Sequence, residues 1–390
     1  MDTTDTTDTV IVIGAGPAGL STAAELLARD VPTTVLERGS ELAATWAARY
    51  KGLRFNTSRR SSALPGAPFP REYGQFPTRE QYLTYLQRYA ADHRIPVETG
   101  VEVTGVRRIR EGWALTTSAG ERRARHVVIA TGLFNRPRIP GWAREPGFDG
   151  EVLHSSAYRD AADFAGRSVV VVGAGSSGME IAHQLATGGA RAVRLAVRTP
   201  PNILLRELNG LPGDLPAPLL FHLPTALADR LVFAVQRRIV GDLSGYGLPR
   251  PTRGMMSRQK ENGAGPAVVD REVIDAIRGG AIECVPAVTA LDGDTVVLAD
   301  GRHVTADAVI LATGYDTGLP DLVAGLDVLD ERGLPLDCTG GEVAPGLRFV
   351  GYVYRPGLTG YVGKIARRVA REIATRSAKE ARRSRHTAAA

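Results

Sequence analysis

The sequence predicts an α/β protein made of two nested dinucleotide-binding (Rossmann-like) domains, and three observations support this fold class. First, the pattern GxGxxG occurs twice, at residues 14–19 and at residues 173–178. Second, each copy follows an apolar run, at residues 10–13 or 169–172, and precedes a helical pattern. Third, strands alternate with helices along the chain, which is typical of mostly parallel sheets covered by helices.

Each glycine-rich loop predicts a cradle for the pyrophosphate of a dinucleotide. Glycines permit the tight turn and the close approach of the backbone to the phosphates, and the N-terminus of the next helix supplies a positive end. Because one chain carries two such loops, we expect two bound dinucleotides that exchange electrons, as in a flavoprotein oxidoreductase. The expected contacts are Gly14, Gly16, Pro17, Ala18 and Gly19 in the first loop and Gly173, Gly175, Ser176, Ser177 and Gly178 in the second.

The two halves of the chain also end alike, which indicates a divergent internal duplication. Each half closes with a short β-meander whose last strand runs into Ala-Thr-Gly. Small residues at such a chain reversal admit a bound dinucleotide. We therefore expect cofactor contacts at Ala130, Thr131, Gly132, Ala312, Thr313 and Gly314; the alternative is an ordinary strand followed by a turn.

This order predicts nested domains. Residues 9–150 are expected to form most of the first domain, residues 151–316 the second, and residues 317–375 to return to the first. The polar ends, residues 1–8 and 377–390, are expected to be disordered. Helices are expected over residues 18–29, 179–186, 225–240 and 360–375, a further helix after a cap at Thr78, and a returning strand over residues 347–351.

A stretch of the second domain, residues 200–262, follows neither the helical nor the strand period cleanly. Because the two halves resemble each other elsewhere, this insertion is where we expect the wall or lid of a substrate pocket. The alternative is a structural elaboration or a contact surface in a homodimer.

The residues after the second strand of each domain distinguish the two dinucleotides. Glu37 stands where an acid bonds the ribose hydroxyls of an adenosine, whereas Arg198 stands at the equivalent place in the second domain. An arginine there would bind the 2′-phosphate of NADPH. We therefore expect FAD in the first domain and NADPH in the second; the alternative for Arg198 is a surface arginine. Arg38, Trp46 and Val103 complete the expected cofactor contacts.

Composition excludes several other classes. The formal net charge is +6, but no aromatic residue follows Tyr361 in the basic C-terminal stretch, so we expect a solvated helix and no nucleic-acid partner. Cys284 and Cys338 form no CxxC pair, and the seven histidines show no metal-ligand spacing, so we expect no redox disulfide and no metal. The N-terminus lacks the pattern of a secretory signal, and no stretch approaches the ~18 apolar residues of a membrane span. We expect a cytoplasmic protein.

One string is far more specific than the glycine loops. Residues 148–158 place Phe148, Gly150, His154 and Tyr158 in the pattern FxGxxxHxxx(Y/F). This is the identifying sequence of the class B flavin-dependent monooxygenases, which the chain resembles over nearly its whole length. Within that family it looks most like the YUCCA-type enzymes and their bacterial relatives, because Tyr158 differs from the Trp of type I Baeyer–Villiger enzymes. Further matching strings lie at residues 68–70, 76–79, 247–251 and 312–315.

The resemblance implies a reaction. NADPH reduces FAD, dioxygen adds to give a C4a-hydroperoxyflavin, and one oxygen atom passes to a small organic substrate. Oxygen transfer to nitrogen or sulfur and oxidative decarboxylation of a 2-oxo acid both remain open. A second reading is a reductase that passes electrons to a quinone or a partner protein without inserting oxygen, and a third is a nucleotide-sensing protein without turnover.

The resemblance also assigns roles to individual residues. Asn56 is the expected catalytic residue, bonding the flavin adduct or the nicotinamide; without the family it reads equally as an Asx turn. The stretch 56–58 departs from the usual YUCCA pattern, so the substrate cannot be carried over from that subgroup. His154 is expected to fix the linker between the domains rather than to move protons, and Trp46 to flank the flavin or belong to the core.

The expected substrate is small and largely hydrophobic or aromatic, because residues 203–223 of the insertion are apolar with few charges. Within that stretch, Arg206 is the expected partner of a substrate carboxylate.

Overall fold

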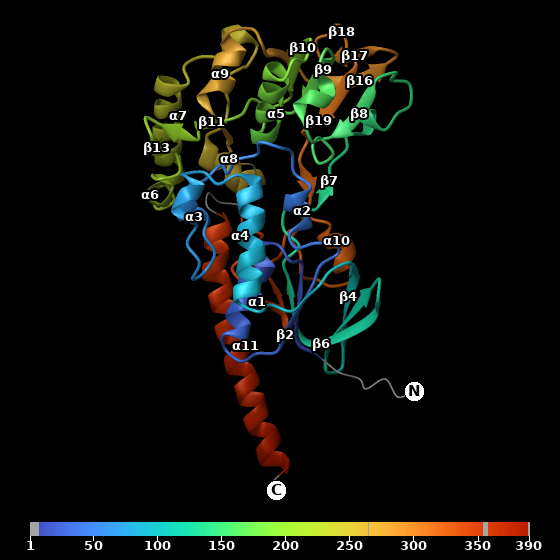
Figure 1. Cartoon of the computed structure of the whole chain (residues 1–390), viewed down its shortest axis with the longest axis vertical. Helices are drawn as coiled ribbons and strands as arrows, with labels where there is room; N and C mark the ends of the chain where they lie inside the picture. Colours follow the sequence, from blue (N-terminus) through green and yellow to red (C-terminus); the bar gives the residue numbers. More distant parts are fainter. Residues whose placement is uncertain (1–7, 264, 354–357, 389–390) are drawn as a thin grey trace.

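A computed structural model describes residues 8–263, 265–353 and 358–388, and it confirms an α/β protein with two parallel-sheet cores (Figure 1). The first core is an eight-stranded sheet with the order β21-β22-β6-β1-β2-β3, to which the hairpin β4-β5 is joined through β6. Strand β22 from late in the chain pairs in parallel with β6, so the chain does return to the first sheet. The strands are β1 (Asp8–Ile13), β2 (Thr33–Leu36), β3 (Val97–Glu98), β4 (Val103–Ile109), β5 (Gly112–Thr117), β6 (Gly120–Ile129), β21 (Glu342–Ala344) and β22 (Leu347–Phe349).

The second core is a five-stranded sheet with the order β15-β10-β9-β19-β8, all of whose neighbours are parallel. A separate antiparallel meander, β16-β17-β18, lies against it. The chain crosses between the cores on two short strands, β7 and β20, which pair antiparallel. The strands are β7 (Arg136–Pro137), β8 (Glu151–His154), β9 (Ser168–Val172), β10 (Ala192–Val197), β15 (Glu283–Pro286), β16 (Val288–Asp292), β17 (Thr295–Leu298), β18 (His303–Thr305), β19 (Ala308–Leu311) and β20 (Tyr315–Asp316).

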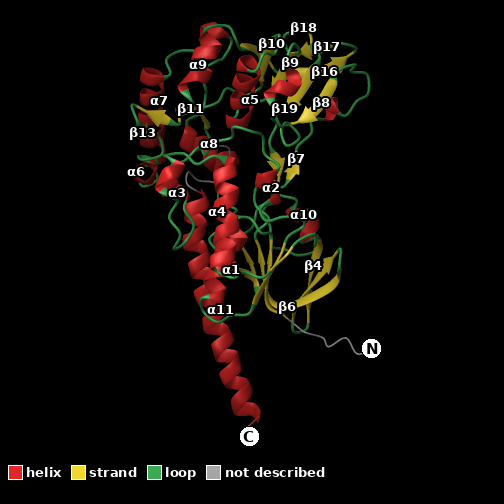
Figure 2. Cartoon of the chain, in the orientation of Figure 1, coloured by secondary structure: helices red, strands yellow, loops and turns green. Residues whose placement is uncertain are grey.

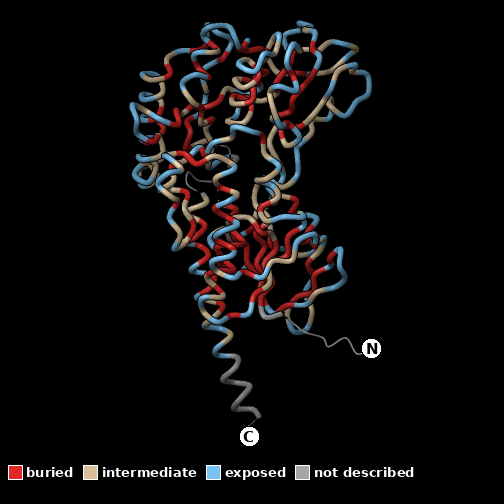
Figure 3. The backbone as a smooth tube through the Cα atoms, in the orientation of Figure 1, coloured by how far each residue is buried: buried red, intermediate tan, exposed pale blue. Residues whose placement is uncertain are grey.

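Alternation along the central strands explains why both faces of each sheet are covered. Val10 and Val12 of β1 pack under helices, whereas Ile11 and Ile13 point to the opposite face, where Val106, Trp113 and Leu115 of the hairpin β4-β5 lie. In the second sheet the same division separates Val169 and Val171 from Val170. Strands buried on both faces read as continuous apolar runs, as the sequence does here. Figure 3 shows that the buried stretches of the backbone lie at the centre of each of the two cores.

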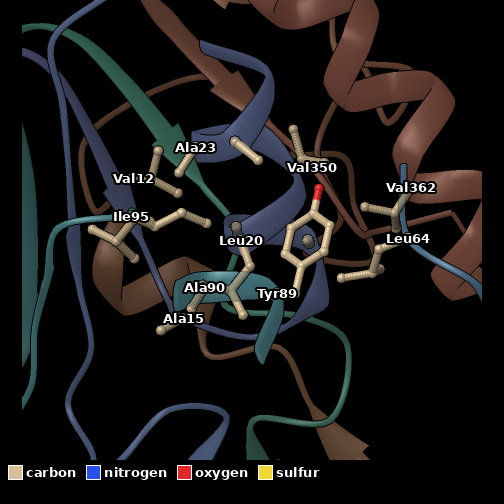
Figure 4. Packing of buried hydrophobic residues seen from close by; sticks show 14 of the residues in the cluster. Val12, Ala15, Leu20, Ala23, Leu64, Tyr89, Ala90, Ile95, Val350 and Val362 are labelled. Atoms are coloured by element: carbon tan, nitrogen blue, oxygen red, sulfur yellow. The ribbon is translucent and has the colours of Figure 1, made fainter. Parts of the chain in front are cut away.

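Helices cover one face of each sheet (Figure 2). Over the first sheet, α1 packs against both α4 and α11, and Figure 4 shows Leu20 of α1 among Tyr89, Val350 and Val362. Helix α4 begins at a capping box in which Thr78 and Gln81 satisfy each other's backbone N–H groups. The helices are α1 (Pro17–Leu27), α2 (Ala44–Ala47), α3 (Arg59–Ser62), α4 (Arg79–Asp92), α5 (Ser176–Thr187), α9 (Arg271–Arg278), α10 (Leu319–Leu322) and α11 (Leu358–Ala388).

The insertion at residues 200–262 forms a helical subdomain at the edge of the second core (Figure 1). The helix expected over residues 225–240 is present as α7, and it packs against α8. The elements here are β11 (Ile203–Leu205), β12 (Glu207–Leu208), β13 (Leu211–Pro212), α6 (Ala217–Leu220), α7 (Thr225–Ile239), α8 (Met255–Asn262) and, just after the insertion, β14 (Ala267–Val269), which pairs with β11.

The prediction that residues 1–8 and 377–390 are disordered is wrong for those of them that the structure describes. Asp8 begins β1, and α11 continues to Ala388, where a disordered tail was expected from residue 377. Alanine, arginine, lysine and glutamate are strong helix formers, and no proline interrupts them, so the helix continues past the body of the molecule (Figure 1). Residues 1–7 and 389–390 lie outside the described residues. No helix in the described part of the chain is long and apolar enough to cross a membrane.

Candidate cofactor site

A cavity of about 660 Å³ lies where both glycine-rich loops face each other. Its walls come from the ends of the parallel strands in both cores, where ligands of open α/β sheets bind. Most of the residues expected from the sequence to contact cofactors line it: Gly14, Gly16, Pro17, Ala18, Glu37, Arg38, Trp46, Asn56, Val103, Ala130, Thr131, Gly132, Gly175, Ser176, Ser177, Gly178, Ala312, Thr313 and Gly314. Five expected site residues, Gly19, His154, Gly173, Arg198 and Arg206, are not among its lining residues.

The two glycine loops have the same local geometry. Gly14 and Gly173 have φ of +104° and +113°, a region that favours glycine, and a Cβ on either would crowd the carbonyl of Ala130 or Ala312. A Cβ at Gly19 would lie 1.8 Å from the Gly14 carbonyl oxygen, and the same holds at Gly178 toward Gly173. The first and third glycines therefore allow the loop, the helix and the Ala-Thr-Gly strand end to pack closely. This explains why Gly19 and Gly173 shape the site without lining it.

The middle glycines differ, because they face open space. A Cβ at Gly16 or Gly175 would meet no atom within 4 Å, and both residues line the cavity. Each precedes the first turn of a helix, α1 or α5, with an extended backbone. These are the positions at which a pyrophosphate could approach the backbone and the positive end of a helix.

Glu37 is held rigidly at the edge of the cavity. One carboxylate oxygen accepts a hydrogen bond from the Ala15 backbone N–H at 2.8 Å, and the other accepts from the Gly39 backbone N–H at 2.9 Å. The residue is only 8% exposed, yet it lines the cavity. A carboxylate fixed in this way keeps lone pairs for the hydroxyls of a ribose. Its neighbour Arg38 also lines the cavity.

An aromatic wall closes the cavity beside Asn56. Trp46 stacks on Phe55 at a ring-centroid distance of 5.3 Å and meets Tyr82 edge-on at 4.8 Å, so it belongs both to the core and to the wall. Tyr50 is buried and donates its hydroxyl hydrogen bond to Glu180 at 3.0 Å. Burial, with a further contribution from Glu180, raises the pKa of Tyr50 well above its usual value. The Tyr50 hydroxyl therefore stays protonated and acts as a donor.

His154 holds the linker and lies outside the cavity wall. Its Nδ1 accepts from the Ser156 backbone N–H at 3.1 Å, so its Nε2 carries the proton and donates to the Gly314 carbonyl at 3.0 Å. Burial, reinforced by Arg49, lowers the pKa of His154 from 6.5 despite the opposing effect of the Gly314 carbonyl. The imidazole is therefore neutral at neutral pH. This geometry is that of a structural histidine that fixes the second Ala-Thr-Gly turn.

The rest of the identifying sequence is also structural. Tyr158 is fully buried, and its ring packs near those of Tyr50 and Phe164. A Cβ at Gly150 would lie 2.6 Å from the Phe148 ring and 2.8 Å from the Asp307 carbonyl oxygen. Phe148 and Tyr158 thus pack in the apolar clusters of the second core, and Gly150 is needed where the chain passes close to Asp307.

The structure overturns the expected role of Arg206. Its side chain is 1% exposed, and its guanidinium lies 2.5 Å from Asp270 and 3.6 Å from Glu180. A buried guanidinium must be paired, and here two carboxylates of the protein already pair it. Arg206 is therefore not free to hold a substrate carboxylate.

The expected pocket wall from the insertion is also largely wrong. None of residues 203–223 lines the cavity, and Leu211, Leu215 and Leu219 are exposed instead. From the whole insertion only Arg258 of α8 lines it, followed in the chain by Gly265 and Pro266. An apolar composition alone did not distinguish a pocket wall from a surface helix. The sequence also predicts the turn at residues 352–358 as a border of the pocket, and residues 354–357 of this turn lie outside the described residues.

Arg198 is exposed just after β10, beyond the cavity wall, and forms no hydrogen bond or ion pair within the described part of the chain. Sequence reasoning missed another cation, Arg258, which lines the cavity and donates to the Pro200 carbonyl at 3.0 Å. It also missed Thr359 and Val362, which lie near the N-terminal end of α11. Arg258 lies in residues 200–262, which have no counterpart in the first half of the chain, so a comparison of the two halves could not identify it.

Neither cysteine belongs to the cavity. Burial raises the pKa of both the Cys284 and the Cys338 thiol to about 11. Both thiols are therefore protonated at neutral pH and weakly nucleophilic. No cysteine occurs among the described residues that line the cavity.

Comparison with known proteins shows which family the chain belongs to. The family described as pyridine nucleotide-disulphide oxidoreductase matches residues 11–203. Among curated proteins, the indole-3-pyruvate monooxygenase YUCCA1 of Oryza sativa subsp. japonica is 37% identical over 315 residues, which is 80% of this chain and 77% of that protein. The probable indole-3-pyruvate monooxygenase YUCCA3 of Arabidopsis thaliana is 33% identical over 395 residues, 97% of this chain and 90% of that protein.

Solved structures show the same fold. A flavin-containing monooxygenase from Stenotrophomonas maltophilia superposes with a TM-score of 0.70 at 24% identity, covering 95% of this chain and 98% of that one. A cyclohexanone monooxygenase superposes with a TM-score of 0.71 at 19% identity, covering 95% and 88% of the two chains.

Proposed function

Because the chain belongs to the class B flavin-dependent monooxygenases, with relatives among the YUCCA-type enzymes, we propose that it uses FAD and NADPH to oxygenate a small organic substrate. The proposed path transfers one oxygen atom from a C4a-hydroperoxyflavin. For an amine or sulfide, one substrate, one dioxygen, one NADPH and one proton would give the oxygenated product, water and NADP⁺. A 2-oxo acid would in addition release carbon dioxide and give the acid that is one carbon shorter. The flavin, when bound, would supply the electron transfer and oxygen activation; the protein supplies binding, orientation and exclusion of water.

The observation that carries this proposal is that two glycine loops of equivalent geometry line one and the same cavity. Gly16 and Gly175 open toward the same space from opposite cores, which suits two dinucleotides whose reactive rings must meet. Glu37 favours FAD at the first cradle because a fixed carboxylate suits free ribose hydroxyls. Arg198 favours NADPH at the second because an exposed guanidinium suits a 2′-phosphate.

The remaining residues have roles that follow from their positions. The first turn of α11 lines the cavity through Thr359 and Val362, so its positive end would stabilise an electron-rich flavin ring. Asn56 would direct a hydrogen bond into the cavity, and Trp46 with its aromatic neighbours would keep water from that wall. His154 would hold the turn at Gly314, and thereby the alignment of the two cores.

The relatives at 33–37% identity are named for indole-3-pyruvate, an aromatic 2-oxo acid, and such acids are the first substrates we propose for this chain. Arg206 cannot hold the carboxylate, so that role would pass to an arginine in the cavity wall, with Arg49 and Arg258 as the candidates. Because residues 56–58 depart from the usual YUCCA pattern, the substrate of those enzymes need not be the substrate here. Amines and sulfides are therefore the second class of substrate that we propose.

Labelled oxygen tests the proposed reaction. Turnover of indole-3-pyruvate, or of an aromatic amine or sulfide, under ¹⁸O₂ with NADPH should place one labelled atom in the product and the other in water. Product formed per NADPH consumed should approach one. Unlabelled product, or electrons delivered to a quinone without oxygen, would instead support a reductase.

A further inference from the structure

A buried ion cluster joins the two cores beside the cavity. Arg206, the N-cap residue Asp270 of α9 and Glu180 of α5 all belong to the second core, and the two carboxylates flank the guanidinium. Burial raises the pKa of Glu180, with Asp270 adding to the effect and Arg206 opposing it. Paired charges in such a place are weak evidence for added stability. Their position beside the cavity points to a different role.

The cluster contacts two cavity-lining residues that come from the first half of the chain. A terminal nitrogen of Arg206 donates to the Asn56 side-chain oxygen Oδ1 at 3.4 Å. On the other side, the Tyr50 hydroxyl donates to Glu180 at 3.0 Å, and the Tyr50 ring packs in the apolar cluster of the second core. Both Asn56 and Tyr50 line the cavity, whereas Arg206 and Glu180 do not. Two residues of the cavity wall are therefore held by charged groups of the second core.

The chemistry of a guanidinium fixes which way the Asn56 amide turns. Arginine has donors and no acceptor, so only Oδ1 of Asn56 can face it. The Nδ2 amide group must then point to the other side. Asn56 Nδ2 has no hydrogen-bond partner among the described residues, and Asn56 is exposed on the cavity. Without the guanidinium the amide could turn over and present Oδ1 to the cavity.

We propose that Arg206 is a positioning residue that holds the Asn56 amide with its N–H group toward the cofactor cavity, and only when the two cores are aligned. This rests on the proposed function for the role of Asn56 but adds a residue outside the cavity. A donor aimed into the cavity can bond an acceptor on the flavin adduct or the nicotinamide, whereas an amide oxygen would repel it. The alignment of the two cores therefore decides whether Asn56 presents a donor or an acceptor to the cavity.

The chain offers a matched control for this proposal. Arg348 of β22 is also buried, 5% exposed at its side chain, and is also flanked by two carboxylates, Glu342 and Glu372. Its Nε, like that of Arg206, has no partner among the described residues. Arg348 does not line the cavity, and its polar partners among the described residues, Gly340, Glu342 and Glu372, do not line it either. Arg206→Gln and Arg348→Gln thus remove comparable buried charges at different distances from the site.

The experiment compares Arg206→Gln, Arg348→Gln, Asn56→Ala and the double variant Arg206→Gln/Asn56→Ala in flavin-loaded protein. The readouts are thermal unfolding, the visible circular dichroism of the bound oxidised flavin, and the fraction of NADPH electrons that ends in hydrogen peroxide. We expect both arginine variants to lower Tm, but only Arg206→Gln to change the flavin dichroism and to raise the peroxide fraction severalfold. The double variant should be no worse than Asn56→Ala alone, because the two residues act through one group.

Two results would overturn the proposal: flavin dichroism and peroxide fraction unchanged in Arg206→Gln, or effects that add in the double variant. If Arg206→Gln does not fold, Arg206→Lys replaces it, because an ammonium keeps the charge beside Asp270 but lacks the planar fork that also reaches Asn56. Arg206→Lys should then change the flavin dichroism and raise the peroxide fraction in the same way. The flavin dichroism separates this idea from the proposed reaction, because it reports on the site even if no oxygenated product is found.

Discussion

Gly16→Val should give a folded but colourless protein. Gly16 has an extended backbone that valine tolerates, and a Cβ there meets no protein atom within 4 Å, so the apoprotein should fold. The new side chain would fill the space in which the pyrophosphate of FAD must approach the backbone and the N-terminus of α1. We expect FAD binding to weaken by a factor of at least 100, because both the helix contact and the backbone hydrogen bonds are lost.

Two variants serve as controls for this result. Gly175→Val makes the same change in the second cradle, so it should keep its yellow colour and lose reduction of the flavin by NADPH. Gly19→Val should fail to fold, because its Cβ would lie 1.8 Å from the Gly14 carbonyl oxygen. The measurements are the ratio of flavin to protein absorbance after reconstitution and the thermal unfolding of the apoproteins. A yellow Gly16→Val protein holding one FAD per chain would show that FAD does not use the first loop.

Arg198→Ala should remove most of the preference for NADPH over NADH. Charge-assisted hydrogen bonds contribute about 1.5–3 kcal/mol. The KM for NADPH should therefore rise by roughly 10- to 100-fold, while the KM for NADH stays nearly unchanged. Steady-state oxidation of both coenzymes measures this directly.

Arg258→Ala is the natural comparison, because Arg258 is the cavity-lining cation that the insertion supplies. If Arg258→Ala has the larger effect on NADPH and Arg198→Ala has none, the 2′-phosphate lies against α8 rather than at the end of β10. Equal use of NADPH and NADH by the unchanged protein would remove Arg198 from the coenzyme site.

The parts of the fold that sequence reasoning predicted correctly are those encoded by short patterns. The glycine loops, the buried valine runs and the repeated Ala-Thr-Gly ends each specify a local backbone shape, and each occurs twice. Because each pattern occurs in both halves of the chain, finding it in one half supported its interpretation as a dinucleotide-binding element in the other. The fold class followed from these patterns, and most of the residues that they marked as cofactor contacts line the cavity.

The errors arose where the outcome depends on distant partners. Arg206 stands in an apolar stretch, and only the fold brings Glu180 and Asp270 to it. The apolar residues of 203–223 do not reveal whether they face a cavity or solvent. At the C-terminus, polarity suggested disorder, yet contacts such as that of Arg376 with Glu342 anchor the helix that continues to Ala388.

Rapid mixing of the reduced, NADP⁺-bound protein with dioxygen tests the central claim most directly. An oxygenating flavoprotein with a cavity closed by both dinucleotides should show a transient absorbance, distinct from reduced and from oxidised flavin, that lasts seconds or longer. Its decay should quicken when the true substrate is added. Direct return to oxidised flavin with one hydrogen peroxide per flavin, and no effect of any substrate on that step, would contradict the account.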